Sequence, residues 1–256
     1  MRMAGLLEVC ADSVCSAVNA ARGGADRIEL CSALPLGGLS PDEDLFCMVR
    51  ERVDIPVRVL LRPRCGDFLY TESEFELLCR QVKRFAALGA DGIVIGMLNP
   101  DGTLDVERMS ALMACGDGCG VTLHRAFDVC RDAHEALRTA KKLGVDTILT
   151  SGQQARCADG ALLLRELVSE SGEGLRILIG GGVNADVIRA LAPQTGADAF
   201  HLSAKAAVPS GMEFRRENVP MGIPGLNEFE LWRCDEGAVR AAREALDAVC
   251  TARKEN

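Results

Sequence analysis

Residues 23–31 read Gly23-Gly24-Ala25-Asp26-Arg27-Ile28-Glu29-Leu30-Cys31, and the centre of this stretch recurs along the chain. A glycine, an alanine or valine and an aspartate stand together four times: Gly24-Ala25-Asp26, Gly89-Ala90-Asp91, Gly144-Val145-Asp146 and Gly196-Ala197-Asp198. Each phrase follows a helix-like segment and precedes an apolar run, so its glycine suits the left-handed position that ends a helix. The phrases lie 65, 55 and 52 residues apart. Such intervals are too long for one strand–helix–strand unit of about 30 residues but fit two.

Four further apolar runs lie between the repeats and bring the number of expected strands to eight. We expect strands at residues 6–10, 27–31, 56–61, 92–96, 120–124, 147–150, 176–179 and 199–202. The segments between them carry apolar residues at helical spacing, as do Phe75, Leu78 and Val82. Apolar strands that alternate with amphipathic helices indicate a parallel sheet covered on both faces.

The number of units predicts one (β/α)8 TIM barrel that occupies residues 1–256 as a single domain. A doubly wound open sheet is the alternative. It is disfavoured because no Gly-x-Gly-x-x-Gly motif follows the first strand.

Composition excludes several classes of protein. The chain has 256 residues, with 37 acidic and 29 basic residues and a net charge of −8, whereas nucleic-acid-binding proteins present a basic face. No apolar run reaches the roughly 18 residues that a membrane helix needs, and Glu8 interrupts the N-terminus before a signal-peptide core can form. We therefore expect a soluble cytoplasmic protein without nucleic-acid or membrane partners.

The 12 cysteines form neither a zinc module nor a disulfide framework. No Cys-x-x-Cys pair exists, and Cys115 and Cys119 form the closest pair. Thiols stay reduced in the cytoplasm, so we expect most of these cysteines to be small buried hydrophobic residues.

In a TIM barrel, function resides at the C-terminal ends of the strands. The polar residues there are candidates for two roles. The candidate acid–base residues are Glu8, Glu29, His124 and Asp128. The candidate anion-binding residues are Arg62, Arg64, Arg125, Gly180, Gly181, His201 and Ser203. Because unpaired buried charges are costly, so many charged groups at one mouth favour a functional pocket, although some are expected to form structural pairs. The third histidine, His134, is expected on the surface of a helix.

The glycines Gly180 and Gly181 belong to a run of three after the seventh strand. Backbone amides of such a turn, with Asn184 as the N-cap of the next helix, can bind phosphate. A tight turn that needs positive φ is the structural alternative.

Two cysteines permit a different chemistry. Cys10 and Cys31 end the first and second strands, which we expect to place them at matching depth, with side chains facing the same way as those of Glu8 and Glu29. Strands lie about 4.8 Å apart, so two thiolates could share one ion, and soft sulfur ligands favour Cu(I).

A long loop is expected after the eighth strand, at about residues 207–233. It carries Met212, Arg215, Arg216, Met221 and the single tryptophan, Trp232. Loops of this length are often lids or binding loops, so it could cap the mouth, contact another subunit or be ordered coil.

The sequence also resembles a known family. The motifs that carry the resemblance are Leu7-Glu8-Val9-Cys10, the stretch at 23–31, Gly37-Gly38-Leu39-Ser40-Pro41, residues 62–70, Thr122-Leu123-His124-Arg125-Ala126-Phe127-Asp128, Leu149-Thr150-Ser151-Gly152, Phe200-His201-Leu202-Ser203-Ala204 and residues 210–215. They are similar to those of the CutC family of copper-homeostasis proteins and span nearly the whole chain. Cys65 departs from the pattern, because the family usually has glycine there.

The resemblance implies a cytoplasmic TIM barrel that forms a homodimer or a higher homo-oligomer. It also implies a role in copper homeostasis, with Cu(I) at the cysteines that match Cys10 and Cys31. The charged mouth suggests an alternative, an enzyme that acts on a phosphorylated or carboxylated small metabolite. No organic cofactor is expected.

Overall fold

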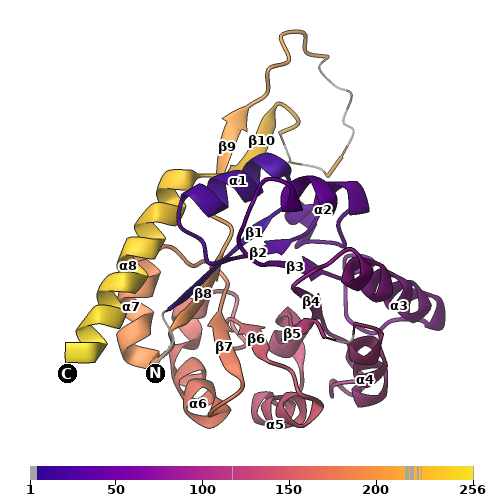
Figure 1. Ribbon diagram of the computed structural model, residues 1–256, viewed down its shortest axis with the longest axis vertical. Helices are drawn as coiled ribbons and strands as arrows, with labels where there is room; N and C mark the ends of the chain where they lie inside the picture. The colour runs from indigo at the N-terminus through magenta and orange to yellow at the C-terminus, as the bar shows by residue number, and fades with distance from the viewer. Residues whose placement is uncertain are drawn as a thin grey trace.

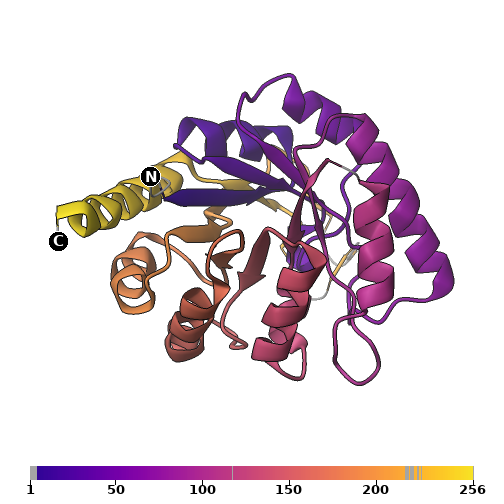
Figure 2. The same ribbon diagram turned by 60° about the horizontal axis from the view of Figure 1, so that its bottom comes forward.

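The computed structural model describes residues 5–116, 118–216, 219, 222–223, 225 and 227–255. Eight parallel strands form a closed barrel in chain order, with the helices around it (Figures 1 and 2). The strands are β1 Leu6–Ala11, β2 Arg27–Leu30, β3 Val57–Leu60, β4 Gly92–Ile95, β5 Gly120–Leu123, β6 Thr147–Thr150, β7 Arg176–Ile179 and β8 Ala199–Leu202. The predicted (β/α)8 barrel is confirmed, and closure of the sheet rules out the doubly wound alternative.

The helices follow the expected amphipathic segments. They are α1 Val14–Arg22, α2 Glu43–Arg50, α3 Glu72–Ala87, α4 Val106–Cys115, α5 Ala133–Leu143, α6 Ala161–Ser171, α7 Ala185–Thr195 and α8 Glu236–Glu255, with short 3-10 turns at Leu34–Leu36, Arg125–Val129 and Cys157–Gly160. Local sequence sets their ends. Thr71 and Glu74 form a reciprocal capping box at α3, and Asn184 caps α7 as predicted. No helix among the described residues combines the length and apolar character needed to cross a membrane.

The four repeats close the barrel at its N-terminal end. Their glycines all have positive φ, between 78° and 94°, as predicted for residues that end helices. Three of the aspartates reach back to the preceding strand and accept its first free N–H: Asp26 from Leu7 at 2.7 Å, Asp91 from Val57 at 2.8 Å and Asp146 from Val121 at 2.6 Å. The repeat therefore satisfies backbone donors that would otherwise be unpaired.

The barrel has a large apolar core outside the sheet and a mixed interior inside it. Outward-facing side chains such as Val9, Ile28 and Phe200 pack against the helices. Inside, the described residues form two small apolar clusters: Cys31 with Leu60 and Val94, and Leu149 with Leu178 and Ala199. The rest of the interior is polar, which is where chemistry can occur.

Strand register orders the interior into layers, with alternate strands contributing to each layer. Reading from the middle of the barrel toward the C-terminal mouth, the layers are Glu8, Arg58, Thr122 and Leu178; then Glu29, Val94, Leu149 and His201; then Cys10, Leu60, His124 and Gly180; and then Cys31, Gly96, Ser151 and Ser203. The candidate residues thus occupy different depths.

The long loop after β8 begins and ends as a two-stranded antiparallel ribbon of β9 Lys205–Pro209 and β10 Glu230–Cys234. Figure 1 shows this ribbon projecting beyond α1 and α2, away from the barrel. Met212 and Phe214, just past β9, are 59% and 65% exposed. Trp232 packs under the Lys205 ammonium at 4.9 Å, and Met221 lies outside the described residues.

Candidate functional site

A buried cluster of charged side chains occupies the middle of the barrel. Glu8 on β1 is fully buried and accepts two hydrogen bonds from neighbouring strands. Its Oε2 accepts from Nε of Arg27 at 2.5 Å, and its Oε1 lies 2.8 Å from Nδ1 of His201. Glu29 lies close by, with its Oε2 buried and without a hydrogen-bond partner among the described residues. Three of the predicted residues, Glu8, Glu29 and His201, therefore come together.

Their surroundings separate the pKa values of the two carboxyl groups. Burial alone would raise the pKa of Glu8, but Arg27 and His201 outweigh it and lower this pKa to about 2. Burial dominates for Glu29, and the neighbouring Glu8 adds to it, so its pKa rises to about 7. Burial would lower the pKa of His201, yet Cys10, Glu29 and Glu8 raise it well above its usual value. At neutral pH the cluster thus holds a charged Glu8–His201 pair beside a carboxyl group that is ready to exchange its proton.

Cys10 and Cys31 face the same interior but lie at different depths. The register pairs Cys10 with Glu29, so Cys31 is two residues further toward the mouth, and the expectation of matching depth is wrong. This offset puts their Cα atoms roughly 8 Å apart, from the strand spacing and the rise per residue. The Cys10 thiol donates to the Leu202 carbonyl at 3.7 Å and the Cys31 thiol to the Ala11 carbonyl at 3.5 Å. Burial raises the pKa of Cys31 well above its usual value.

His124 lies in the same layer as Cys10, on the opposite side of the interior. Its ring is 4.8 Å from that of Phe68, and its Nδ1 accepts the N–H of Ala126. Burial and the charge of Arg62 lower its pKa to about 3, so it is neutral. Its buried Nε2 has no partner among the described residues. His124 is therefore separate from the Glu8 cluster.

Arg62 and Arg64 bind the protein's own backbone and carboxylates. The Arg62 guanidinium donates to the carbonyls of Gly37 and Gly38 and, at 2.9 Å, to that of Gly66. It thereby joins the loops after β2 and β3. Arg64 is on the surface, where it pairs with Glu74 at 2.6 Å and Asp67 at 3.1 Å.

Arg125 and Asp128 organise the turn after β6. Asp128 accepts hydrogen bonds from the Thr150 hydroxyl, from Ser151 and from the N–H of Gln153. It also pairs with Arg125 at 2.7 Å. With both carboxylate oxygens occupied, Asp128 is placed to hold this turn.

The glycines after β7 are needed for close packing. A Cβ on Gly180 would lie 2.6 Å from the Leu149 side chain. One on Gly181, which has φ +94°, would lie 3.0 Å from the Ser151 side chain. Ser203 lies at the mouth beside this turn, in the same layer as Cys31.

Sequence reasoning missed the arginines inside the barrel. Arg27 shares the strand face of Glu29, and this two-residue period was the signal that could have revealed it. Arg58 crosses the interior to Asp146, at 2.7 Å, over the glycines that open β4 and β5. A Cβ on Gly92 or Gly120 would approach Arg58 to 2.9 or 2.5 Å, so a glycine at each strand start was a second signal.

All 12 cysteines are free, as expected, but only five of them are buried, so the prediction that most are buried is wrong. Cys65 is exposed, while Cys115 and Cys119 are partly buried and the Cys119 thiol donates to the Ala90 carbonyl.

Two sets of side chains could bind a metal. The donor atoms of Glu8, Glu29 and His201 lie within 4.8 Å of one another, but Arg27 and His201 already occupy both oxygens of Glu8. The thiols of Cys10 and Cys31 are the softer set.

Known proteins are similar to this chain in both sequence and fold. The CutC family model matches residues 5–206. A CutC-named protein of Chromobacterium violaceum is 41% identical over 242 residues, which cover 94% of this chain and 98% of the relative. The human copper homeostasis protein cutC homolog is 42% identical over 236 residues, 92% of this chain and 86% of the relative.

Solved structures agree with this relationship. A CutC structure from Streptococcus agalactiae has a TM-score of 0.73 at 26% identity, covering 78% of this chain and 98% of that chain. The thiamine phosphate pyrophosphorylase of Pyrococcus furiosus shares the fold alone. Its TM-score is 0.56 at 19% identity, covering 95% of this chain and 96% of that chain. The family model, the relatives and the fold lead to one conclusion: the chain belongs to the CutC family.

Proposed function

We propose that this chain acts in copper homeostasis and binds Cu(I) as its cargo through Cys10 and Cys31. One observation carries the proposal: two buried thiols on neighbouring strands face the same interior, one layer apart. Thiolates are soft ligands that select Cu(I), and a pair of them is a reasonable site for it.

The surroundings of the two thiols support this function. Cys31 packs with Leu60 and Val94 under Leu34, which limits the access of water. A Cα separation of roughly 8 Å is too long for a disulfide without backbone movement, so the thiols stay available. His201, whose pKa is raised by Cys10, Glu29 and Glu8 although burial lowers it, places a positive charge beside the Cys10 thiol.

The human relative named as a copper homeostasis protein is 42% identical to this chain, which further supports the proposal. A cytoplasmic location and a homodimer or higher assembly remain expectations. Sedimentation of the purified protein measures the assembly directly.

An anaerobic Cu(I) titration against a competing chelator tests the proposal. We expect one tight equivalent in the wild type and its loss in the Cys10→Ser/Cys31→Ser variant. The matched control is Cys15→Ser/Cys65→Ser, which removes two exposed thiols and leaves the interior unchanged. Equal affinity in the wild type and the Cys10/Cys31 variant would disprove this site.

A second candidate is an enzyme that acts on a phosphorylated or carboxylated small metabolite from the C-terminal mouth. The observation that favours it is the Glu29 carboxyl group, which is buried with an unpartnered oxygen beside the Glu8–His201 pair. Structural packing gives no reason for an unpaired buried carboxyl group. Glu29 would serve as the acid or base, with Glu8 orienting His201.

A thermal-shift screen of sugar phosphates and 2-oxo acids tests the second candidate. We expect a substrate-like compound to raise Tm in the wild type and to lose this effect in His201→Asn. The control is Arg189→Gln, which removes an exposed partner of Asp186 on α7 and should respond as the wild type does. A compound that stabilises His201→Asn equally would show that binding does not involve this cluster.

A further inference from the structure

A cavity of about 740 Å³ opens at the N-terminal end of the barrel, opposite the mouth where the sequence placed the function. Its lining comes from the starts of β2, β3, β6 and β7, from the end of α6 and from the turns that lead into β7 and β8. The volume is within the range of about 300–1,000 Å³ that is usual for small-molecule sites. The space is large enough for an organic ligand.

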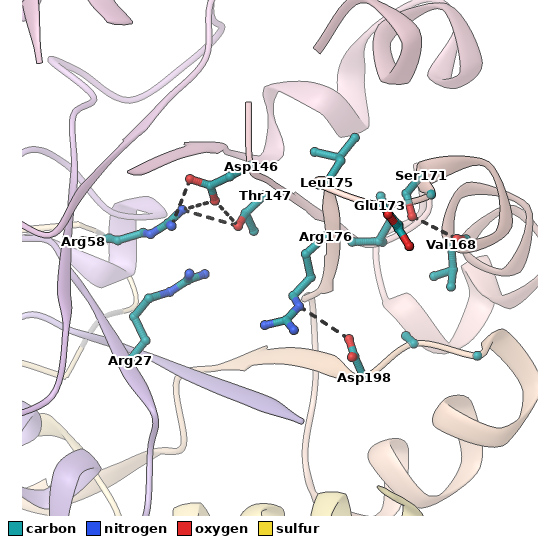
Figure 3. A pocket seen from close by; sticks show the side chains of 15 residues that line it. Arg27, Arg58, Asp146, Thr147, Val168, Ser171, Glu173, Leu175, Arg176 and Asp198 are labelled. Atoms are coloured by element: carbon teal, nitrogen blue, oxygen red, sulfur yellow. Dashed lines mark hydrogen bonds and ion pairs between the residues drawn. The ribbon is translucent and has the colours of Figure 1, made fainter. Parts of the chain in front are cut away.

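Three guanidinium groups face this cavity (Figure 3): those of Arg27, Arg58 and Arg176. They come from three different strands, and Figure 3 shows Arg176 extending toward Asp198, with Arg27 and Arg58 on the other side of the space. A guanidinium presents a planar array of donors that matches carboxylate and phosphate oxygens. Their convergence therefore points to an oxyanion.

Two of the three arginines have terminal nitrogens that no hydrogen bond uses. Arg58 is the exception, because both of its terminal nitrogens donate, to Asp146 and to the hydroxyls of Thr122 and Thr147. Arg27 uses only its Nε, for Glu8, and its Nη2 is buried without a partner among the described residues, on a side chain that is 10% exposed. The Arg176 side chain makes no hydrogen bond within the described part of the chain, and its Nε lies 3.6 Å from Oδ1 of Asp198.

The role of Asp198 differs from that of the other repeat aspartates. The carboxylates of Asp26, Asp91 and Asp146 each accept a strand N–H. The Asp198 carboxylate accepts no strand N–H among the described residues, while its backbone carbonyl accepts the N–H of Leu6, just as the carbonyls of Asp91 and Asp146 accept those of Gly120 and Arg176. The Asp198 carboxylate thus has no strand-capping role in the described structure and faces the cavity beside Arg176.

We propose that this cavity binds a small organic oxyanion, a phosphate or a carboxylate, between Arg27 and Arg176. The anionic group takes the free donors of these two arginines, which nothing else in the described structure uses. The remainder of the ligand extends toward Glu173 and Asp198, whose oxygens accept hydrogen bonds from hydroxyl or amino groups. These acids balance the arginines in charge, so the site selects a ligand with both an anionic group and donors.

Arg27 connects this site to the interior of the barrel. The same Arg27 side chain that lines the cavity holds Glu8 through its Nε. An occupied cavity therefore fixes the position of Arg27 beneath the Glu8–His201 pair. The site does not depend on copper binding at Cys10 and Cys31.

Isothermal titration of the full chain with three probes tests the proposal: inorganic phosphate, glycerol phosphate and succinate. We expect saturable binding of at least one probe to the wild type and about tenfold or greater weakening in Arg176→Gln, since a charged hydrogen-bond donor is lost. Arg189→Gln is the matched control, because within the described part of the chain the Arg189 side chain pairs only with Asp186, on the surface of α7. Its affinity should equal that of the wild type.

Asp198→Asn should change the affinity for the anion in the opposite direction, toward tighter binding. A misfolded variant would not bind more tightly. Removal of this carboxylate frees Arg176 and should tighten binding of the anion by at least about threefold. A preference for glycerol phosphate or for succinate identifies the ligand as a phosphate or a carboxylate. The proposal is overturned if none of the probes binds saturably, or if Arg176→Gln or Asp198→Asn binds as the wild type does.

Discussion

Glu8 connects three strands of the barrel through two hydrogen bonds. It lies on β1, Arg27 on β2 and His201 on β8, and its side chain is completely removed from solvent. A buried charge without its partner is far more costly than an intact buried pair. Stability therefore depends strongly on each member of this set.

Replacement of Glu8 by glutamine leaves the Arg27 and His201 charges buried without an anion. We expect Glu8→Gln to lower the free energy of unfolding by about 3–5 kcal/mol, measured by urea denaturation. Glu76→Gln, which removes an exposed partner of Arg80, should cost less than about 0.5 kcal/mol. A cost near that of the control would show that Glu8 is not buried with its partners as described.

Glu29 gives the protein a distinct pH dependence. Its pKa is raised from 4.5 to about 7, so the folded protein keeps a proton that the unfolded chain has already released. As a result, the contribution of Glu29 to the free energy of unfolding is most favourable below about pH 4.5. This contribution declines as pH rises through about 7, where Glu29 in the folded protein also loses its proton. Between pH 4.5 and 8.5, the free energy of unfolding of the wild type should fall by up to about 3 kcal/mol relative to that of Glu29→Gln. Parallel stability profiles for the two proteins would contradict this account.

At the scale of single elements, glycines at the starts of β4 and β5 make room for Arg58. A Cβ on Gly120 would lie 2.5 Å from Nη2 of Arg58 and 3.0 Å from Asp146. We expect Gly120→Ala to push Arg58 from its partners and to cost about 1–3 kcal/mol in thermal or urea unfolding. Gly211→Ala, with open space around it, should stay within about 0.5 kcal/mol of the wild type. Equal stability of the two variants would mean that Arg58 does not cross the interior there.

The contact between α5 and α6 includes a histidine–carboxylate pair on the surface. His134 lies 2.6 Å from Glu170, whose hydrogen bond raises the pKa of His134, and its surface position was predicted. The pair stabilises the fold fully below about pH 6.5, the pKa of a histidine in the unfolded chain. The stabilisation is lost as pH rises through the higher pKa that His134 has in the folded protein. Because His134 is partly exposed, His134→Gln should cost only about 0.5 kcal/mol at pH 6 and nearly nothing at pH 9. The same cost at both pH values would refute this assignment.

At the scale of the whole molecule, the fold could be predicted because it repeats. The phrase at residues 24–26 returns at 89, 144 and 196, and each copy fixes a helix end and a strand start. All eight strands lie where apolar runs predicted them. The sequence pattern contains no comparable signal for strand register, which depends on packing across the sheet. For this reason Cys10 was expected level with Cys31 but is paired with Glu29.

The interior was only partly predictable for the same physical reason. The strand-end positions of Glu8, Glu29 and His201 located a cluster that the structure brings together. Strand ends could not reveal that Arg62 turns back to loop carbonyls or that Asp128 holds the turn after β6. Attention to the C-terminal ends also left out Arg27, Arg58 and Arg176, which face the cavity at the other end.

X-ray absorption at the copper edge of the protein loaded with one equivalent of Cu(I) identifies the copper ligands directly. We expect a first shell of sulfur from Cys10 and Cys31, and loss of this sulfur shell in the Cys10→Ser/Cys31→Ser variant. The Cys15→Ser/Cys65→Ser control should give the wild-type spectrum. A first shell of nitrogen and oxygen in the wild type, or an unchanged sulfur shell in the Cys10/Cys31 variant, would contradict the proposed Cu(I) site.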